Sequence, residues 1–260
     1  MTRAHEDYGI DAPTVVRSLA AIGALLLIVG AATAALLHLH VVEPGPLPRV
    51  LRNNGLATAI VCLVMAGWMF ASSRWLKHRV ARDLLDSRQW RGDETVLDVG
   101  CGRGLVAVAA CRRVPNGRVT GIDIWRERDL GGNSPEAILA NAEAAGVADR
   151  LVVDTGDARS LPYADGSFDV VASMTAIHNI RGAAGRAAAV AEVWRVTKPG
   201  GQILIFDIRH ARTHAAGLRA AGATDVRLDG PILLWGPFGW RVSATKPHAG
   251  MVGGSPCGNP

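Results

Sequence analysis

Cysteine is scarce in this sequence, and its four cysteines are scattered without a CxxC pair or the spacing of a metal-binding set. Such a distribution indicates reduced thiols in a cytosolic environment and argues against a disulfide framework. No internal repeat is visible. The 260 residues fit one ordinary domain with an added segment, and not two full domains.

Charge is absent from two long stretches near the N-terminus. Neither Ser18–Val42 nor Leu56–Ser73 contains Asp, Glu, Lys or Arg, and at about 1.5 Å per residue the first can cross a hydrocarbon core of about 30 Å. The link Glu43–Pro48 is rich in proline, which cannot continue a helix. The two stretches therefore predict a transmembrane helical hairpin with both ends on one side. The alternatives are a secretory signal, which the second span disfavours, and a hairpin buried in a soluble fold.

Basic side chains crowd the region after the second stretch, and the formal net charge of the chain is +5. The loop between the stretches offers only Arg49 and Arg52, so the positive-inside rule places the C-terminal part in the cytoplasm. An apolar stripe within Trp75–Trp90 predicts a helix whose cations face anionic lipid headgroups or water. A nucleic-acid partner is disfavoured because the basic region adjoins a membrane span. Its cations are Arg74, Lys77, Arg79, Arg82, Arg88 and Arg91.

From Thr95 onward, strand-like and helix-like runs alternate, as a doubly wound parallel sheet requires. The predicted strands are 95–99, 118–122, 150–154, 168–173, 202–208, 224–229 and 239–245, and the predicted helices are 104–113, 134–145, 183–196 and 211–221. The predicted organisation is a polar lead (1–17), the hairpin (18–73, with spans 18–42 and 56–73), a basic linker helix (74–92), an α/β domain (93–247) and a disordered tail (248–260).

The first strand of the α/β domain leads into a glycine-rich turn, and Val96 to Gly104 reads VLDVGCGRG. Glycines at alternate positions let the backbone approach a nucleoside cofactor closely. A second strand-like run ends in an acid, Asp123. Three further segments are Gly156-Asp157-Ala158, Phe168-Asp169-Val170-Val171 and Lys198-Pro199-Gly200-Gly201. Over roughly residues 84–247, this combination resembles the class I S-adenosylmethionine-dependent methyltransferases.

The resemblance implies a seven-stranded Rossmann-like sheet with an antiparallel last strand, and S-adenosylmethionine as cofactor. It implies that Asp98 and the glycine turn hold the methionine portion, whose ammonium and sulfonium groups are cationic. Asp123 is implied to accept ribose hydroxyls, and Asp157 to meet the adenine amine. Turn capping is the alternative for Asp157 and core filling the alternative for Trp125. The implied cofactor contacts are Asp98, Gly100, Cys101, Gly102, Gly104, Asp123, Ile124, Trp125, Asp157, Ala158 and Ser173.

A nicotinamide-dependent oxidoreductase is the rival from another enzyme class. Asp98 suits a pyrophosphate poorly, and Leu105 stands where a GxGxxG fingerprint has its third glycine. A non-catalytic membrane module that binds the cofactor without turnover is the other alternative. The oxidoreductase is less consistent with the set of motifs than a methyltransferase, whereas the membrane module would carry the same motifs.

The segment after the fourth predicted strand is expected at the carboxyl edge of the sheet, next to the methyl group. There His178 is the candidate general base, because imidazole titrates near neutrality, and Asn179 is a candidate to orient the acceptor. A histidine that only shapes the pocket is the alternative. The sequence lacks an Asn/Asp-Pro-Pro-aromatic motif, which argues against amino groups of nucleic acid bases. We expect no metal site, since His210 and His214 have no clear carboxylate partner.

These features predict a membrane-anchored methyltransferase with a cytoplasmic catalytic domain and a small or lipophilic acceptor. The acceptor classes left open are a thiol, a phenol or quinol, and a lipid headgroup. The run Gly156–Asp169 is similar to that of quinone-biosynthesis and related small-molecule methyltransferases. The loop 126–133 is longer than a minimal connection, so it is either a lid from which Asn133 reaches inward or a solvated loop.

Overall fold

The computed structural model describes residues 5–127, 129–234 and 238–248. These residues form two compact units. The sheet unit takes its described residues from 1–9, 77–127 and 132–260, and the hairpin unit takes them from 10–76 and 128–131. The predicted tail lies outside the described residues, apart from position 248.

The sheet unit is built on seven strands in the order β3-β2-β1-β4-β5-β7-β6. β7 runs antiparallel to both of its neighbours, and the pairs among β1 to β5 are parallel. This confirms the predicted α/β class and the Rossmann-like sheet with its antiparallel last strand. The strands are β1 (Thr95–Val99), β2 (Arg118–Asp123), β3 (Leu151–Thr155), β4 (Phe168–Met174), β5 (Thr197–Asp207), β6 (Thr224–Leu233) and β7 (Phe238–Thr245).

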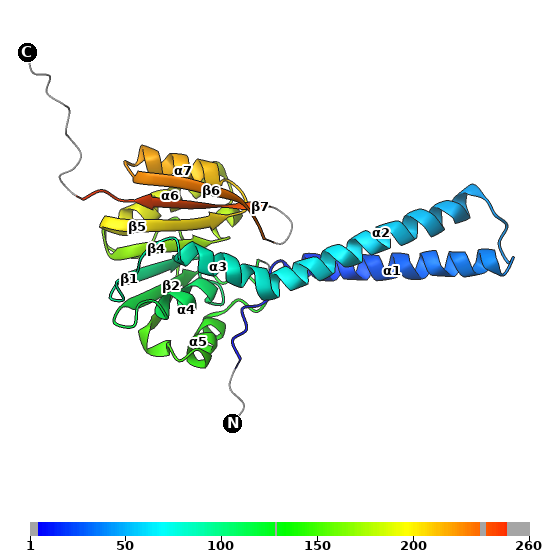
Figure 1. The fold of residues 1–260 in the computed structure, drawn as a ribbon, viewed down its shortest axis with the longest axis horizontal. Coiled ribbons are helices and arrows are strands. Elements are labelled where there is room, and N and C mark those ends of the chain that lie inside the picture. The colour runs from blue at the N-terminus through cyan, green and yellow to red at the C-terminus, as the bar shows by residue number, and fades with distance from the viewer. Residues whose placement is uncertain (1–4, 128, 235–237, 249–260) are drawn as a thin grey trace, which may run out of the picture. The chain divides into compact units, whose positions relative to one another are not determined.

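Helices lie on both faces of the sheet (Figure 1). Successive side chains of a strand point to opposite faces, so Val96 of β1 joins one buried cluster and Leu97 the other. The first cluster is completed by α3, α4 and α5, and the second by α6 and α7. These helices are α3 (Lys77–Leu85), α4 (Leu105–Cys111), α5 (Pro135–Ala144), α6 (Ala183–Val196) and α7 (Ala211–Ala220), with 3-10 turns η2 (Ala148–Arg150) and η3 (Ile177–Asn179).

The helix starts follow from local sequence. At α5, the Ser134 hydroxyl accepts a hydrogen bond from the backbone N–H of Ala137 at 3.2 Å, and Pro135 occupies the first turn. Proline is tolerated there because its missing N–H has no intrahelical acceptor. The same rule explains a difference from the sequence-based expectation: the polar residues 49–54, expected in the loop between the two spans, belong to α2 (Pro46–Ala71).

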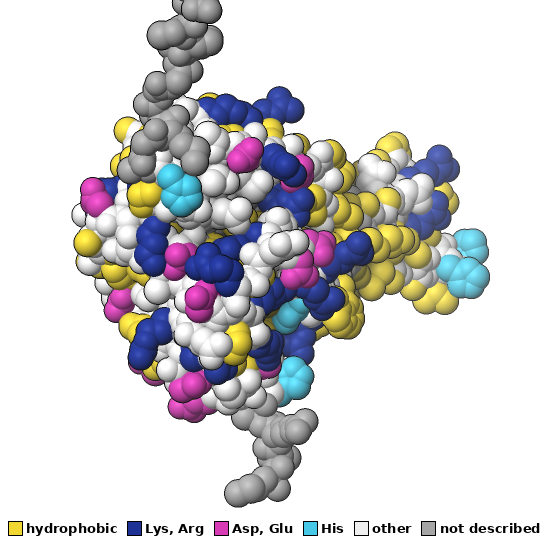
Figure 2. Space-filling view, turned by 60° about the vertical axis from the view of Figure 1, so that its left-hand side comes forward, with side chains coloured by type: hydrophobic (Ala, Val, Ile, Leu, Met, Phe, Trp, Pro, Cys, Tyr) yellow, Lys and Arg dark blue, Asp and Glu magenta, His cyan; other side chains and the backbone are white. Residues whose placement is uncertain are grey.

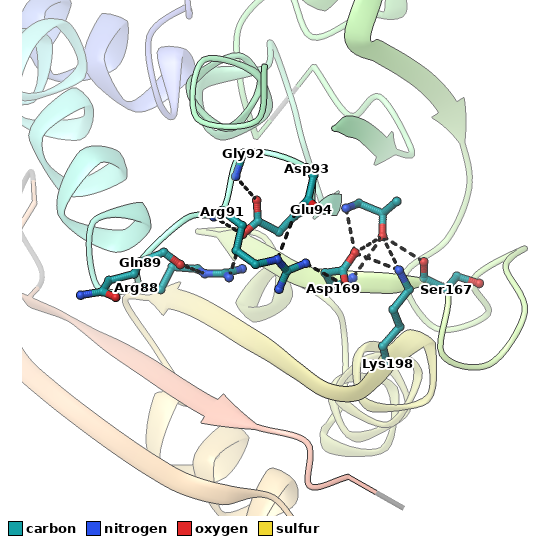
Figure 3. Close-up of polar contacts among 10 residues, drawn as sticks. Arg88, Gln89, Arg91, Gly92, Asp93, Glu94, Ser167, Asp169 and Lys198 are labelled. Carbon is teal, nitrogen blue, oxygen red and sulfur yellow. Dashed lines mark hydrogen bonds and ion pairs between the residues drawn. The ribbon is translucent and has the colours of Figure 1, made fainter. Parts of the chain in front are cut away.

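The amino-terminal ends of β1, β4 and β5 are joined by a polar network (Figure 3). The carboxylate of Asp169 on β4 accepts hydrogen bonds from the Thr95 hydroxyl at 2.6 Å and from Lys198 Nζ at 2.8 Å. These contacts outweigh the effect of burial and lower the pKa of the Asp169 carboxyl to about 2. The fully buried Glu94 accepts from the N–H groups of Arg91 and Gly92 at 2.8 and 3.0 Å. Two motif residues, Asp169 and Lys198, therefore stabilise the sheet at the edge opposite the carboxyl ends of β1, β4 and β5.

The hairpin unit consists of α1 (Pro13–His38), α2 and a π-helical turn, η1 (Ser72–Leu76). α1 and α2 pack closely where Gly23 faces Leu63 and Gly30 faces Leu56; a Cβ on either glycine would lie 2.8 Å from the leucine. The helical stretches Pro13–His38 and Pro46–Leu85 are long and apolar enough to cross a membrane.

Most of the apolar surface of this unit has no protein partner among the described residues. Only 11% and 22% of the most apolar windows of the two stretches are buried. Leu25, Ile28 and Val64 are each more than 60% exposed, and Figure 2 shows hydrophobic side chains over most of the visible surface of the hairpin. A helix that serves as the core of a soluble fold would bury such residues.

Part of the loop between β2 and α5 belongs to the hairpin unit. Leu130 forms an isolated antiparallel bridge with Asp11, and the N–H of Gly131 donates to the carbonyl of Ile10 at 3.4 Å. The described residues 129–131 are thus paired with the chain that leads into α1. Whether the whole loop 126–133 acts as a lid stays a prediction.

Candidate active site

The glycine turn follows β1 and needs glycine for two reasons. Gly100 and Gly104 have φ values of +75° and +86°, a region that residues with a side chain rarely adopt. A Cβ on Gly100 would lie 2.2 Å from the Cβ of Ala176, and one on Gly104 would lie 2.6 Å from Ile138. The turn is therefore a bare backbone surface held tightly between α5 and the chain after β4.

Asp98 lies beneath this turn with 1% of its surface exposed. Its Oδ2 atom is buried and has no hydrogen-bond partner among the described residues. Burial raises the pKa of the Asp98 carboxyl to about 7, and the nearby Asp123 carboxylate adds to the shift, while the N–H of Ala107 opposes it. A buried carboxylate with an unmatched oxygen suits a cationic group, because an opposite charge would favour its ionised form.

Asp123, at the end of β2, organises the loops around it. Its Oδ2 accepts the N–H of Gly102 at 2.9 Å, and its Oδ1 accepts the N–H of Trp125 at 2.7 Å and the amide of Asn133 at 3.3 Å. Asn133 is buried and reaches inward. A carboxylate offers about four acceptor positions, so three donors leave room for a ligand hydroxyl.

The residues predicted to contact adenine differ in how exposed they are and in their contacts. Ile124 is 42% exposed beside Asp123, whereas the Trp125 indole is partly buried and donates to the Thr155 hydroxyl at 2.7 Å. Asp157 is held by Arg159 in an ion pair of 2.6 Å, which lowers the pKa of the Asp157 carboxyl. Ala158 packs against the second buried cluster. The adenine roles of these residues stay predictions.

Two of the predicted cofactor contacts have side chains that serve the fold. Cys101 is buried, and a Cβ at Gly121 would lie 2.9 Å from its sulfur, so the thiol packs into β2. Burial raises the pKa of the Cys101 thiol. The Ser173 hydroxyl on β4 donates to the carbonyl of Val99 at 2.9 Å. The backbone of Cys101 is also engaged, because its N–H donates to the carbonyl of Ile122 at 3.2 Å and its carbonyl accepts the N–H of Gly104 at 2.8 Å. The cofactor roles of Cys101 and Ser173 stay predictions.

His178, on η3, is in direct contact through Nδ1 with the carboxylate of Asp207 at the end of β5. Asp207 also accepts the backbone N–H of His178 at 3.0 Å and lies 3.5 Å from Nε2 of His214. Burial alone would raise the pKa of the Asp207 carboxyl, but its contacts with the two histidines hold that pKa below its ordinary value. The His178 side chain is 11% exposed and the Asp207 side chain 1% exposed, so the carboxylate lies behind the imidazole.

This partner was missed by sequence reasoning, which found no carboxylate for His214 either. The available signal was an acid at the end of a strand, the same signal that identified Asp123. Asn179, by contrast, is exposed and donates to the carbonyl of Thr175 at 3.4 Å. Within the described parts of the chain, no group of three or more His, Cys, Asp or Glu side chains is arranged to hold a metal ion.

Residues 97–205 match a family model described as a methyltransferase domain. Together with the seven-stranded sheet and its glycine turn, this makes the sheet unit a class I, Rossmann-like S-adenosylmethionine-dependent methyltransferase domain. S-adenosylmethionine is the cofactor of that family, and the unmatched oxygen of Asp98 and the open position at Asp123 fit its cationic and hydroxyl groups.

Two relatives show which subgroup the chain is similar to. It is 35% identical over 131 residues to the ubiquinone/menaquinone biosynthesis C-methyltransferase UbiE of Paracoccus denitrificans, covering 50% of this chain and 49% of that protein. It is 33% identical over 117 residues to the 27-O-demethylrifamycin SV methyltransferase of Amycolatopsis mediterranei, covering 45% and 39%. The chain thus spans about half the length or less of these curated relatives.

Solved structures support the fold alone. A [4+2]-cyclase, SpnF, has a TM-score of 0.53 at 22% identity, covering 66% of this chain and 81% of that one. A SAM-dependent methyltransferase from Aquifex aeolicus has a TM-score of 0.50 at 19% identity, covering 64% and 89%. Because the fold also occurs in a cyclase, the reaction has to be argued from the site.

Proposed function

We propose that this chain is a membrane-anchored S-adenosylmethionine-dependent methyltransferase whose acceptor is a lipophilic phenol or quinol. The observation that carries the proposal is the pairing of His178 with Asp207 at the edge of the sheet that also holds the glycine turn. The similarity to a quinone C-methyltransferase and to an O-methyltransferase is consistent with it. Thiols and lipid headgroups remain the competing acceptors.

The bound cofactor supplies a methyl group activated by a sulfonium. The anionic Asp207 in contact with Nδ1 of His178 favours the proton on that nitrogen, which leaves the lone pair on Nε2. His178 then takes the proton of the acceptor hydroxyl. Deprotonation makes both the phenolic oxygen and the ring carbon beside it better nucleophiles. For O-methylation the proton stays with His178 and is then lost to water. For C-methylation the proton on the attacked ring carbon must also leave, and the imidazolium of His178 returns a proton to the phenolic oxygen. The same pairing stabilises the imidazolium that forms.

No acid is required next to the transferred carbon. The positive charge on sulfur is lost during transfer, so a carboxylate close to it would oppose the reaction. Asp98 and Asp123 are proposed to hold the amino acid and ribose portions instead. Transfer then depends on aligning donor and acceptor at short range and on excluding water.

A lipophilic acceptor agrees with a membrane anchor. Lys77 is buried, and its ammonium donates to the carbonyls of Tyr8 and Gly9 at 2.8 and 2.7 Å. Residues 9 and 77 flank the hairpin in the chain, so this contact within the sheet unit joins the chain before the hairpin to the chain after it, which agrees with both ends of the hairpin lying on one face of a membrane. With the basic residues that follow the second span, we propose that the sheet unit lies in the cytoplasm.

The test is a cofactor-consumption assay of the full-length chain in lipid vesicles, against quinols, thiols and lipids, with product mass determined. A general base contributes about 10²–10⁴-fold to rate, so His178→Ala should lower turnover of a quinol at least tenfold. S-adenosylhomocysteine affinity should barely change, and the loss should shrink as pH rises because the acceptor ionises unaided.

The matched control is His248→Gln, which changes an exposed histidine near Gly200, at the start of β5. It should keep full turnover. An equal loss at every pH for His178→Ala would indicate a positioning role and overturn the general base. Cofactor binding without consumption of any acceptor would favour the non-catalytic module.

A further inference from the structure

Residues 5–9 belong to the sheet unit and have no regular secondary structure; they are called the N-terminal strap. Tyr8 is buried in the first hydrophobic cluster, with its ring 5.3 Å from that of His78. At one end of the strap Glu6 pairs with Arg112, and at the other Lys77 holds the carbonyls of Tyr8 and Gly9. Sequence analysis predicted only a polar lead here, because a single tyrosine gives no periodic pattern.

The middle of the strap is bound to the glycine turn. Arg103, within that turn, donates through Nε to the carbonyl of Asp7 at 2.8 Å and through its terminal nitrogen to the Asp7 carboxylate at 2.8 Å. Asn141 on α5 is 3% exposed; its amide donates to the carbonyls of Asp7 and Arg103, both at 2.8 Å, and its oxygen accepts the N–H of Asp7 at 2.7 Å. Strap, turn and helix are thus joined by one set of hydrogen bonds.

The same arginine reaches the segment that supports Asp123. Arg103 donates to the carbonyl of Gly132 at 3.3 Å, and the next residue, Asn133, donates to Asp123 at 3.3 Å. Asp123 in turn accepts the N–H of Gly102. The turn is therefore held at Gly102 by Asp123, and Arg103 links it to Asp7 and Gly132.

We propose that Asp7 and Arg103 are positioning residues that order the cofactor loops, so that the strap before the first span strengthens cofactor binding. An arginine in a glycine turn loses side-chain freedom when it is fixed, and the turn itself costs backbone entropy to order. Contacts made before the cofactor arrives remove part of that cost from binding. The inference rests on the proposed cofactor site.

The test measures S-adenosylhomocysteine affinity of the full-length chain by calorimetry. Arg103→Ala removes hydrogen bonds of a charged group and should weaken binding about tenfold. Asp7→Ala should weaken it less, because the backbone carbonyl of residue 7 remains. If Asp7 and Arg103 act through the same contact, the double variant should bind S-adenosylhomocysteine no more weakly than Arg103→Ala alone.

The matched control is Arg112→Ala. It removes another arginine that holds the strap, through Glu6, but it does not contact the glycine turn or Gly132 in the described structure. Its affinity should change less than twofold. Arg103→Lys keeps the positive charge but has a single donor nitrogen in place of the guanidinium fork. Its affinity should lie between those of wild type and Arg103→Ala, and it guards against misfolding of the alanine variant.

A second readout needs no ligand. Amide hydrogen exchange at 100–104 and 132–133 should speed up in Arg103→Ala, while exchange in β1 and β4 and the thermal midpoint stay near wild type. Unchanged affinity and unchanged exchange in Arg103→Ala would overturn the inference. If wild type itself fails to bind S-adenosylhomocysteine, the proposed function fails, whereas the exchange result still decides whether the strap orders the turn.

Discussion

Cofactor binding should release a proton from Asp98. In the free protein the pKa of this buried carboxyl is raised to about 7, first by burial and then by Asp123. Its Oδ2 has no partner among the described residues, so a ligand ammonium placed there would favour the ionised form and lower the pKa. Binding and ionisation are therefore linked.

The magnitude follows from the ionised fraction. With a pKa near 7, about 9% of the carboxyl is ionised at pH 6 and about 91% at pH 8, so affinity should rise about tenfold across that range. Affinity should increase with pH because the cofactor-bound protein holds fewer protons than the free protein. At pH 6, binding should release about 0.9 proton per site.

Calorimetry with S-adenosylhomocysteine measures both quantities. The affinity is followed from pH 6 to 8, and the binding enthalpy at pH 6 is compared in phosphate and Tris, whose ionisation enthalpies differ. Asp98→Asn should bind more weakly at pH 8 and lose the pH dependence. A flat affinity in the wild type, with an enthalpy independent of the buffer, would refute the reasoning.

Three further predictions concern other parts of the molecule. Asp207→Asn should lower turnover at least tenfold with S-adenosylhomocysteine affinity unchanged, because the amide no longer fixes the proton of His178 on Nδ1; full turnover by kinetic assay would contradict this. Asp169→Asn should lower the free energy of unfolding by about 1–2 kcal/mol at neutral pH. Because the folded-state pKa of Asp169 is depressed to about 2, this difference from wild type, measured by chemical unfolding, should vanish as pH falls from 4 to 2. Alkaline carbonate extraction should leave the full-length chain in the membrane pellet, and its appearance in the supernatant would contradict the anchor.

Most of the sheet unit was predictable because its elements are locally encoded. The observed β1 matches the predicted strand, and α6 begins and ends where the apolar pattern does. The glycine turn and the acids after β1 and β2 were also identified, since residue type and position at a strand end are visible in the sequence. The helices of the hairpin begin earlier than predicted, because Pro13 in α1 and Pro46 and Pro48 in α2 lie in a first turn that tolerates proline.

Contacts between distant side chains were not predictable in the same way. Periodicity assigned Lys77 to a basic juxtamembrane face, yet it is buried against the carbonyl groups of the N-terminal strap. Asp7 and Arg103 lie far apart in the chain, and no local pattern signals their pairing. Such partners depend on how whole elements pack.

The sequence by itself determined the alternation of strands and helices, the cofactor turn and the presence of two apolar spans, because each depends on neighbours along the chain. Only the tertiary structure decided that Asp207 supports His178, because the two residues come from different strand ends. It also decided that Asp169 and Lys198 stabilise the opposite edge. The parallel register brings these residues together, and that register is set by burying both faces of the sheet at once.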